Sequence, residues 1–425
     1  MNVFLLALKQ ILQRPLQSGI NLLVMALGLG MVSLLLLGQH QFEERMGRDA
    51  AGIDLVVGAP GSPMQLILST IYHVDIPTGN IPLDARETVE EEAGVAATIP
   101  LALGDNFQGF RVVGTESDLI EHYEGQFASG GNWDQSLEAV LGARVADATG
   151  LGVDDEFMPQ HGLGDGGPTH GDHPHRVVGV LEPTGSVLDR LILTSVESVW
   201  ETHEHHEHDA DHAHDEDHDE GHAADHSHEQ DAEGAETEPH GTPGEITALL
   251  VRYAAPIAAA RLPDRIDRET PWQSASPAYQ SARLASLVAP AIQGIQWLGA
   301  ILLGAALLGV VALIYQNLAE RRYDLALLRA MGARPGWLFL LTLVQGLILV
   351  AAGLTLGLAG SHLAMELMGG MTTEGENLGL TGRTWVAAQS WLVMGVLAVG
   401  LLLTLLPAWL AARMEVAATL RQGPD

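Results

Sequence analysis

Apolar residues gather in four long runs, separated by stretches that are much more polar. These runs cover residues 16–39, 286–317, 336–368 and 386–411. Each run can cross the hydrocarbon core of a bilayer, which needs roughly 20 mostly apolar helical residues. The first run follows Lys9 and Arg14, but it is too long for a secretory signal and lacks a small-x-small cleavage pattern before Gln39. The pattern therefore predicts four transmembrane helices, the first of them uncleaved.

The long polar stretch between the first two runs has the pattern of a folded domain. Short β-rich runs alternate with Gly and Pro turns at residues 54–58, 110–115, 176–181, 191–194 and 245–253. Apolar residues have helical spacing at 66–72 and 137–151. We predict an α-helical membrane protein with four transmembrane helices and an inserted α+β domain at residues 40–285.

Basic residues outside the runs indicate the orientation of the chain. They lie before the first run, between the second and third, and after the fourth, at Lys9, Arg14, Arg321, Arg322, Arg329, Arg334, Arg413 and Arg421. Cytoplasmic loops carry such an excess of Lys and Arg. We therefore expect an amphipathic segment at 1–15, a helix at 318–335 and the C-terminal segment 412–425 in the cytoplasm. The inserted domain and the short loop at 369–385 then lie on the outer side.

The net charge of −32 arises from the inserted domain, because residues 40–285 hold 46 of the 53 acidic residues. Such a surface repels nucleic acid and anionic lipid and attracts cations, so we expect no nucleic-acid partner. The chain has no cysteine. Neither disulfides nor thiolate chemistry is therefore available to the domain.

Residues 201–240 form an insert with almost no large apolar side chains, which predicts a disordered loop. Neutral imidazole binds Zn, Cu or Ni, and neighbouring carboxylates add attraction for cations. The spacing is too irregular for a fixed zinc site, so we expect exchangeable binding of Zn or another divalent metal. The alternative is a merely solvated loop. The candidate ligands are His203, His205, His206, His208, His212, His214, His218, His222, His226 and His228.

A second, sparser histidine group precedes the strand predicted at 176–181. It consists of His161, His170, His173 and His175. Because imidazoles close to the insert can add ligands to it, we regard this group as a further source of metal ligands.

Two pairs of residues stand out in the third apolar run. Gly353 and Gly357 have the spacing that lets helices approach closely, and packing is their expected role. His362 and Glu366 lie four residues apart near the outer end, where ionisable groups are costly unless paired or wet. We favour a local pair or snorkelling over a functional role for them.

The cytoplasmic segment 320–334 reads as an amphipathic helix. Leu325, Leu328 and Met331 share one face, and charged side chains occupy much of the remainder. Gly332 provides a C-terminal stop. Such a helix between two spans can dock into a partner and pass on its motion. The alternative is an interfacial helix that rests on anionic lipid.

This segment resembles the Glu-Arg-Arg-x-Glu-Ile-x-Leu-Leu-Arg-Ala-Leu-Gly-Ala signature of MacB/FtsX-like permeases, with Asp324 at the second acidic position. Residues 406–413 and 419–421 are similar to the closing elements of the family, although Val416 stands where the family usually has Pro. Shorter motifs at 58–65, 77–80 and 104–106 resemble those of a subgroup.

The resemblance implies a multi-pass permease subunit of an ABC transporter complex in the bacterial inner membrane, with a periplasmic inserted domain. It implies two copies of a separate ATPase, a permease homodimer surrounded by membrane lipid, and a periplasmic adaptor or lipoprotein. In such complexes ATP-driven motion reaches the periplasmic domain for substrate export or lipoprotein handling. The residues expected to couple to the ATPase are Glu320, Arg321, Arg322, Asp324, Leu325, Leu328, Arg329 and Gly332. Two alternatives are an FtsX-like signal transmitter that transports nothing and a metal-handling complex that uses the His-rich loop.

The chain carries no motor or enzyme motif of its own. Its only lysine is Lys9, and no Gly-rich loop precedes it, so a Walker A site is excluded and ATP must be bound by a partner. Neither a nucleophile elbow nor an HExxH motif is present. We therefore expect no catalytic residues and no intrinsic cofactor apart from metal on the His-rich loop.

Removal of the His-rich insert should leave folding and assembly intact, because a loop with few apolar groups contributes no core. The number of zinc ions bound per chain should fall at the same time. Isothermal titration of the purified protein with Zn²⁺ measures this change. Unchanged zinc capacity after the deletion would refute metal binding by the insert.

Overall fold

The computed structural model describes residues 3–13, 15–162, 173–204, 244–320, 330, 334–371 and 379–413. Its internal contacts divide the chain into two compact units. The membrane unit comprises Met1–Glu44 and Ser286–Asp425, and the inserted unit comprises Arg45–Ala285. This division confirms the predicted insertion of one domain between the first two transmembrane helices.

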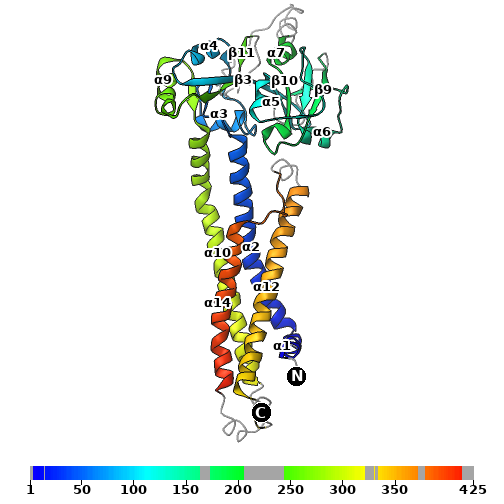
Figure 1. The fold of residues 1–425 in the computed structure, drawn as a ribbon, viewed down its shortest axis with the longest axis vertical. Helices are drawn as coiled ribbons and strands as arrows, with labels where there is room; N and C mark the ends of the chain where they lie inside the picture. The colour runs from blue at the N-terminus through cyan, green and yellow to red at the C-terminus, as the bar shows by residue number, and fades with distance from the viewer. Residues whose placement is uncertain are drawn as a thin grey trace, which may run out of the picture. The chain divides into compact units, whose positions relative to one another are not determined.

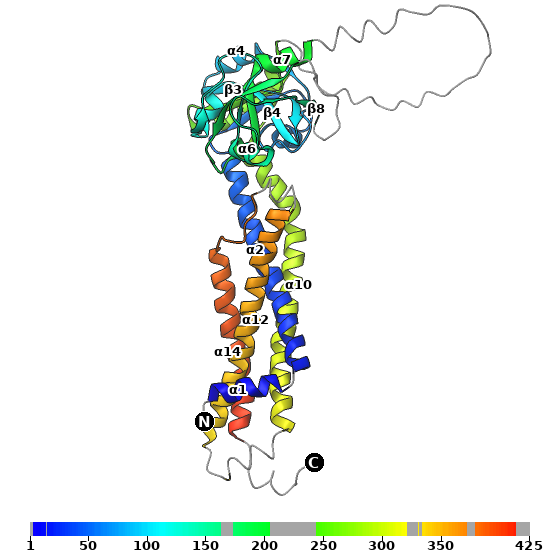
Figure 2. The ribbon, with the colours of Figure 1, turned by 90° about the vertical axis from the view of Figure 1, so that its right-hand side faces the viewer.

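The membrane unit is built from long apolar helices that run side by side (Figures 1 and 2). Among the described residues, four helices are long and apolar enough to cross a membrane, as predicted. They are α2 (Pro15–Asp49), α10 (Pro277–Glu320), α12 (Pro335–Met371) and α14 (Ala387–Ala412). The segment predicted at the N-terminus forms the short helix α1 (Val3–Leu12), which packs against α12.

Small residues let the long helices approach one another, as is usual for spans that lack a hydrophobic driving force for association. A Cβ atom on Gly357 would lie 3.0 Å from Leu29 of α2, and one on Gly353 would lie 2.5 Å from the sulfur of Met25. Both glycines therefore serve packing, as expected. The buried side chains around them are Met25, Leu29, Leu303, Ala306, Leu307, Val350, Leu354 and Val396.

A mixed β-sheet forms the centre of the inserted unit (Figure 1). Its main path runs β13-β1-β12-β3-β4-β10-β6-β9-β5. β4 with β10 and β6 with β9 pair in parallel. Its strands are β1 (Leu55–Gly58), β3 (Val95–Phe107), β4 (Phe110–Thr115), β5 (Phe127–Gly130), β6 (Glu138–Leu141), β7 (Glu156–Phe157), β8 (Gln160–His161), β9 (His175–Leu181), β10 (Leu191–Ser195), β12 (Ala248–Tyr253) and β13 (Gln273–Ala275). A separate two-stranded sheet pairs β2 (Ile81–Pro82) with β11 (Glu245–Ile246).

Short helices connect the strands and cover the sheet. They are α3 (Pro63–Thr70), α4 (Ala85–Glu90), α5 (Asp118–His122), α6 (Ala143–Thr149), η1 (Val187–Arg190), α7 (Val196–Glu204), η3 (Pro256–Ala260) and α9 (Leu262–Glu269). The mixture of strands and helices confirms the predicted α+β class of this unit.

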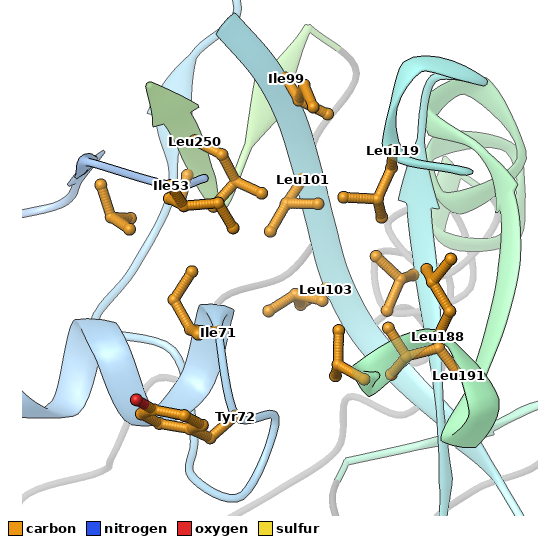
Figure 3. Close-up of a cluster of buried hydrophobic side chains, with 14 of the residues drawn as sticks. Ile53, Ile71, Tyr72, Ile99, Leu101, Leu103, Leu119, Leu188, Leu191 and Leu250 are labelled. Atoms are coloured by element: carbon orange, nitrogen blue, oxygen red, sulfur yellow. The ribbon is translucent and has the colours of Figure 1, made fainter. Parts of the chain in front are cut away.

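Alternate residues of the central strands belong to two different apolar cores. Val56 and Leu250 lie in one core, whereas Val57 and Leu249 lie in the other. Because successive side chains of a strand point to opposite faces, the two cores cover the two faces of the sheet. Figure 3 shows the first core, in which Leu101 and other residues of β3 lie between α3 and the segment around η1.

The helix predicted at 137–151 is only partly correct. Its first part is the strand β6, which is buried on both faces between β10 and β9, and the helix α6 begins after Gly142. A short apolar run of this kind cannot be assigned to strand or helix from periodicity alone. The helix predicted at 66–72 is confirmed as α3, which begins earlier, at Pro63.

The predicted start of the His-rich insert, residue 201, needs correction. Helix α7 continues to Glu204, and Thr202 and His203 are buried. Thr202 fits the helix because its hydroxyl donates to the carbonyl of Ser198 at 2.7 Å. Residues 205–240 lie outside the described residues, and a deletion that tests their role must therefore begin after Glu204.

Replacement of Gly142 by Ala should destabilise the inserted unit by about 1–3 kcal/mol, the usual cost of overpacking. A Cβ atom there would lie 2.0 Å from the carbonyl oxygen of Leu188, which belongs to the backbone of η1. The melting temperature of the purified protein measures the effect. Gly131→Ala is the control, because no atom lies within 4 Å of its Cβ position. Equal melting temperatures for the two variants would contradict this packing argument.

Candidate functional sites

The segment expected to couple to an ATPase lies almost entirely outside the described residues. Glu320 is the last described residue of α10. The other seven expected residues, Arg321, Arg322, Asp324, Leu325, Leu328, Arg329 and Gly332, are not described. Their role stays a prediction.

The end of α2 is held inside the inserted unit by a buried ion pair. Asp49, the last residue of α2, is 1% exposed, and its carboxylate accepts a hydrogen bond from Nη2 of Arg190 at 2.6 Å. A carboxylate at a helix C-terminus faces the negative end of the helix dipole, so it requires such a cation. The backbone carbonyl of Asp49 also accepts a hydrogen bond from the hydroxyl of Tyr123.

Burial fixes the protonation state of Tyr123. Desolvation, with a smaller contribution from the charge of Asp49, raises the pKa of Tyr123 well above its usual value. The phenol therefore remains a neutral donor at all physiological pH values. Loss of one partner from a buried pair such as Asp49–Arg190 typically costs about 3–5 kcal/mol, because the other charge stays buried.

The beginning of α10 is held by a second contact in the same unit. The hydroxyl groups of Tyr72 and Ser281 lie 2.7 Å apart, and Ser281 donates to the carbonyl of Pro277, the first residue of α10. Arg190 links the two contacts, because its Nη2 also lies 3.4 Å from the carbonyl of Tyr72. We call Asp49, Tyr72, Tyr123, Arg190 and Ser281 the helix junction.

His73 adjoins the helix junction and is sensitive to its charge. Its Nδ1 has almost no accessible surface. Burial, followed by the positive charges of Arg190 and Arg111, lowers the pKa of His73 well below its usual value of 6.5. The imidazole is therefore neutral in the folded protein at neutral pH.

His362 and Glu366 of α12 do not bond to each other but to the segment before α14. Nδ1 of His362 lies 2.6 Å from the carbonyl of Gly382, and Glu366 accepts from the backbone nitrogen of Gly382 at 2.8 Å. The amide nitrogen of Gln389 lies 3.2 Å from Nε2 of His362 and donates to the hydroxyl of Ser33 in α2 at 2.8 Å. These contacts satisfy the polar groups locally, which is a packing role.

Of the ten insert histidines proposed as metal ligands, His203 alone lies within the described residues. It is buried at the end of α7. In the second histidine group His161, His173 and His175 are described, whereas His170 is not.

The structure brings together two of these histidines and one aspartate. Asp105 of β3, His161 of β8 and His203 of α7 each offer one ligand atom, and these atoms all lie within 4.8 Å of one another. Asp105 was not among the predicted ligands. Its signal in the sequence was the polar pair Asp105 and Asn106 within the apolar run of a strand, both of which are buried.

Comparisons with known proteins identify the C-terminal part of the chain. Residues 297–416 match the family described as FtsX-like permease C-terminal. The periplasmic region of MacB from Actinobacillus actinomycetemcomitans is 9% identical, with a TM-score of 0.33, and covers 57% of this chain and 97% of that structure. The extracellular domain of the noncanonic ABC-type transporter YknZ from Gram-positive bacteria is 11% identical, with a TM-score of 0.29, and covers 52% of this chain and 98% of that structure. Comparison with curated proteins gives no match.

The stability of the inserted unit should depend on His73 below neutral pH. Above about 6.5 the histidine is neutral in both folded and unfolded chains. As the pH falls from there toward the lowered pKa of folded His73, only the unfolded chain binds the proton, so stability is lost. His73→Asn should reduce this loss, and Asn tolerates the φ of 54° at this position. Melting temperatures measured from pH 7.5 to 5 test this, and parallel curves for both proteins would count against it.

Proposed function

We infer that this chain, whose residues 297–416 belong to the FtsX-like permease family, is the membrane subunit of an ABC transporter complex that transmits ATP-driven motion to its inserted domain. The match confirms the MacB/FtsX-like permease predicted from the cytoplasmic and C-terminal motifs. Membership of this family supports the assignment of the chain as a permease subunit that associates with an ABC ATPase. The four apolar helices support a membrane protein.

The helix junction is the observation that carries the mechanical part of this proposal. α2 and α10 are continuous helices that have residues in both units. Rigid secondary-structure elements transmit motion when the contacts at their ends stay formed. A buried ion pair at the end of a helix is such a contact. Through Asp49–Arg190 and Tyr72–Ser281, displacement of either helix acts directly on the core of the inserted unit.

The ATPase drives this motion through the cytoplasmic segment between α10 and α12. Two ATPase copies act on a permease homodimer in the bacterial inner membrane, with both chain termini in the cytoplasm and the inserted domain in the periplasm. Arg322 and Arg329 bind the ATPase, because guanidinium groups suit interface ion pairs. The periplasmic output is substrate export or the handling of a lipoprotein or other periplasmic substrate. The alternative output is activation of a periplasmic partner without transport.

Charge reversal at Arg322 and Arg329 should weaken binding of the ATPase by about tenfold or more, which corresponds to about 1.4 kcal/mol or more of interface energy. Co-purification and stimulation of ATP hydrolysis measure this. A double reversal at the exposed Arg252 and Arg261 of the inserted unit is the matched control. Undiminished co-purification of the Arg322→Glu/Arg329→Glu variant would rule out the coupling role.

The variant Asp49→Asn should distinguish the role of the helix junction from the role of the ATPase contact. A chain without cysteine allows one spin label at Glu87→Cys, an exposed site on α4, and pulsed electron resonance then gives the distance between the two copies in the complex. ATP should shift this distance in the parent protein. Asp49→Asn should reduce the shift and leave co-purification unchanged, whereas the Arg322/Arg329 variant should lose both. A full shift in Asp49→Asn would remove the junction from the mechanism.

A further inference from the structure

Asp105, His161 and His203 come from three segments that are far apart in the sequence. Nδ1 of His161 lies 3.4 Å from Oδ1 of Asp105, and Nε2 of His203 lies 3.5 Å from Oδ2. The two imidazole rings are nearly perpendicular, with centroids 5.3 Å apart. Both rings thus direct a nitrogen toward the same carboxylate.

The position of Asp105 is set by an irregularity of β3. The register between β3 and β4 shifts between Leu103 and Asp105, which is a β-bulge. Bulges commonly redirect a side chain, and they are common next to functional sites. Asp105 is 2% exposed. A carboxylate so deeply buried needs compensating positive charge.

Strand β8, which carries His161, is paired with β3 next to Asp105. His161 and Asp105 are direct partners in the pairing of β8 with β3. The amide of Asn106 donates to the carbonyls of Gln160 and Gly162, at 3.3 and 2.8 Å. These bonds hold the backbone on both sides of His161, so its imidazole is preorganised.

Helix α7 brings His203 to the same point. Val199 anchors the helix in the second core, and the indole of Trp200 donates to the carbonyl of Glu245 at 2.7 Å. Glycines in the strands beneath permit the close approach. A Cβ atom on Gly104 would lie 3.2 Å from Nε2 of His203, and one on Gly114 would lie 2.6 Å from Val199.

The spacing of the three groups suits a shared cation. Ligands at about 2.0–2.2 Å from a tetrahedral zinc ion are about 3.3–3.6 Å from one another. The two imidazole nitrogens lie 3.4 and 3.5 Å from different oxygens of the Asp105 carboxylate, and one ligand atom from each of the three residues lies within 4.8 Å of the other two. These contacts are longer than an ordinary N–H···O hydrogen bond.

We propose that Asp105, His161 and His203 form a binding site for a zinc-type divalent cation. Two imidazoles with one carboxylate are borderline donors that favour Zn²⁺ over Ca²⁺ or Mg²⁺, which prefer oxygen ligands. The ion ties the end of α7 and strand β8 to β3. This site is distinct from exchangeable binding by the histidines that follow residue 204, and it does not depend on the permease function.

The test uses the full chain, purified in detergent and equilibrated with Zn²⁺ in the presence of a competing chelator that strips weak sites. Elemental analysis should find one tightly held zinc per chain in the parent protein. Asp105→Asn and His203→Ala should weaken this binding by more than about 100-fold, because loss of a ligand exceeds the effect of a lost supporting contact. His122→Ala, which removes a half-buried histidine of α5 outside the proposed site, is the matched control and should retain the ion.

A second variant separates the site from the insert. Replacement by Ser of every histidine from His205 to His228 should leave the tight zinc in place. Its loss from this variant, or its retention in both His161→Ala and His203→Ala, would overturn the proposal.

A spectroscopic and a thermal measurement distinguish loss of the metal site from misfolding of a variant. Co²⁺ in place of zinc should give the visible absorption of a tetrahedral site with nitrogen and oxygen ligands in the parent protein and not in Asp105→Asn. Zn²⁺ should raise the melting temperature of the parent protein but not that of Asp105→Asn. Equal zinc-induced stabilisation of both proteins would contradict the site, whatever their stability without metal.

Discussion

Asp49 closes a long apolar helix with a negative charge, and that charge lies inside the inserted unit next to Arg190. Neither ion is stable there alone, since a buried charge must be paired and hydrogen-bonded. The pair therefore constrains where α2 ends, where η1 lies and how Tyr72 and Tyr123 pack. Because Tyr72 also contacts Ser281 near the start of α10, one electrostatic requirement fixes both helix ends in this unit.

Strand β3 connects the two parts of the sheet. Its first half pairs with β12 and its second half with β4 and β8, so it joins the two parts of the sheet. The bulge lies where the pairing changes, and Asp105 emerges there. The same strand thus supplies apolar side chains such as Leu101 and Leu103 to the core, and a carboxylate to the proposed metal site.

Sequence patterns predicted the parts of this protein that depend on local or one-dimensional properties. The four long helices were predicted because roughly 20 apolar residues are required of any span. The strands at 110–115 and 191–194 followed from β-branched runs between turns, and the structure contains β4 and β10 there. Residues 138–141 were assigned to a helix because burial on both faces removes the alternation that identifies a strand.

The amino-acid order by itself determined the membrane class, the insertion of a domain after the first span and the family of the C-terminal part, since each is written in contiguous residues. Only the tertiary structure decided which charged and polar side chains meet. Asp49 and Arg190, or Asp105, His161 and His203, are separated by long stretches of chain and carry no shared periodicity. The proximity of Asp105, His161 and His203 follows from strand register, a bulge and the approach of α7 over two glycines. Such contacts result from the packing of the whole unit and leave no local signature in the sequence.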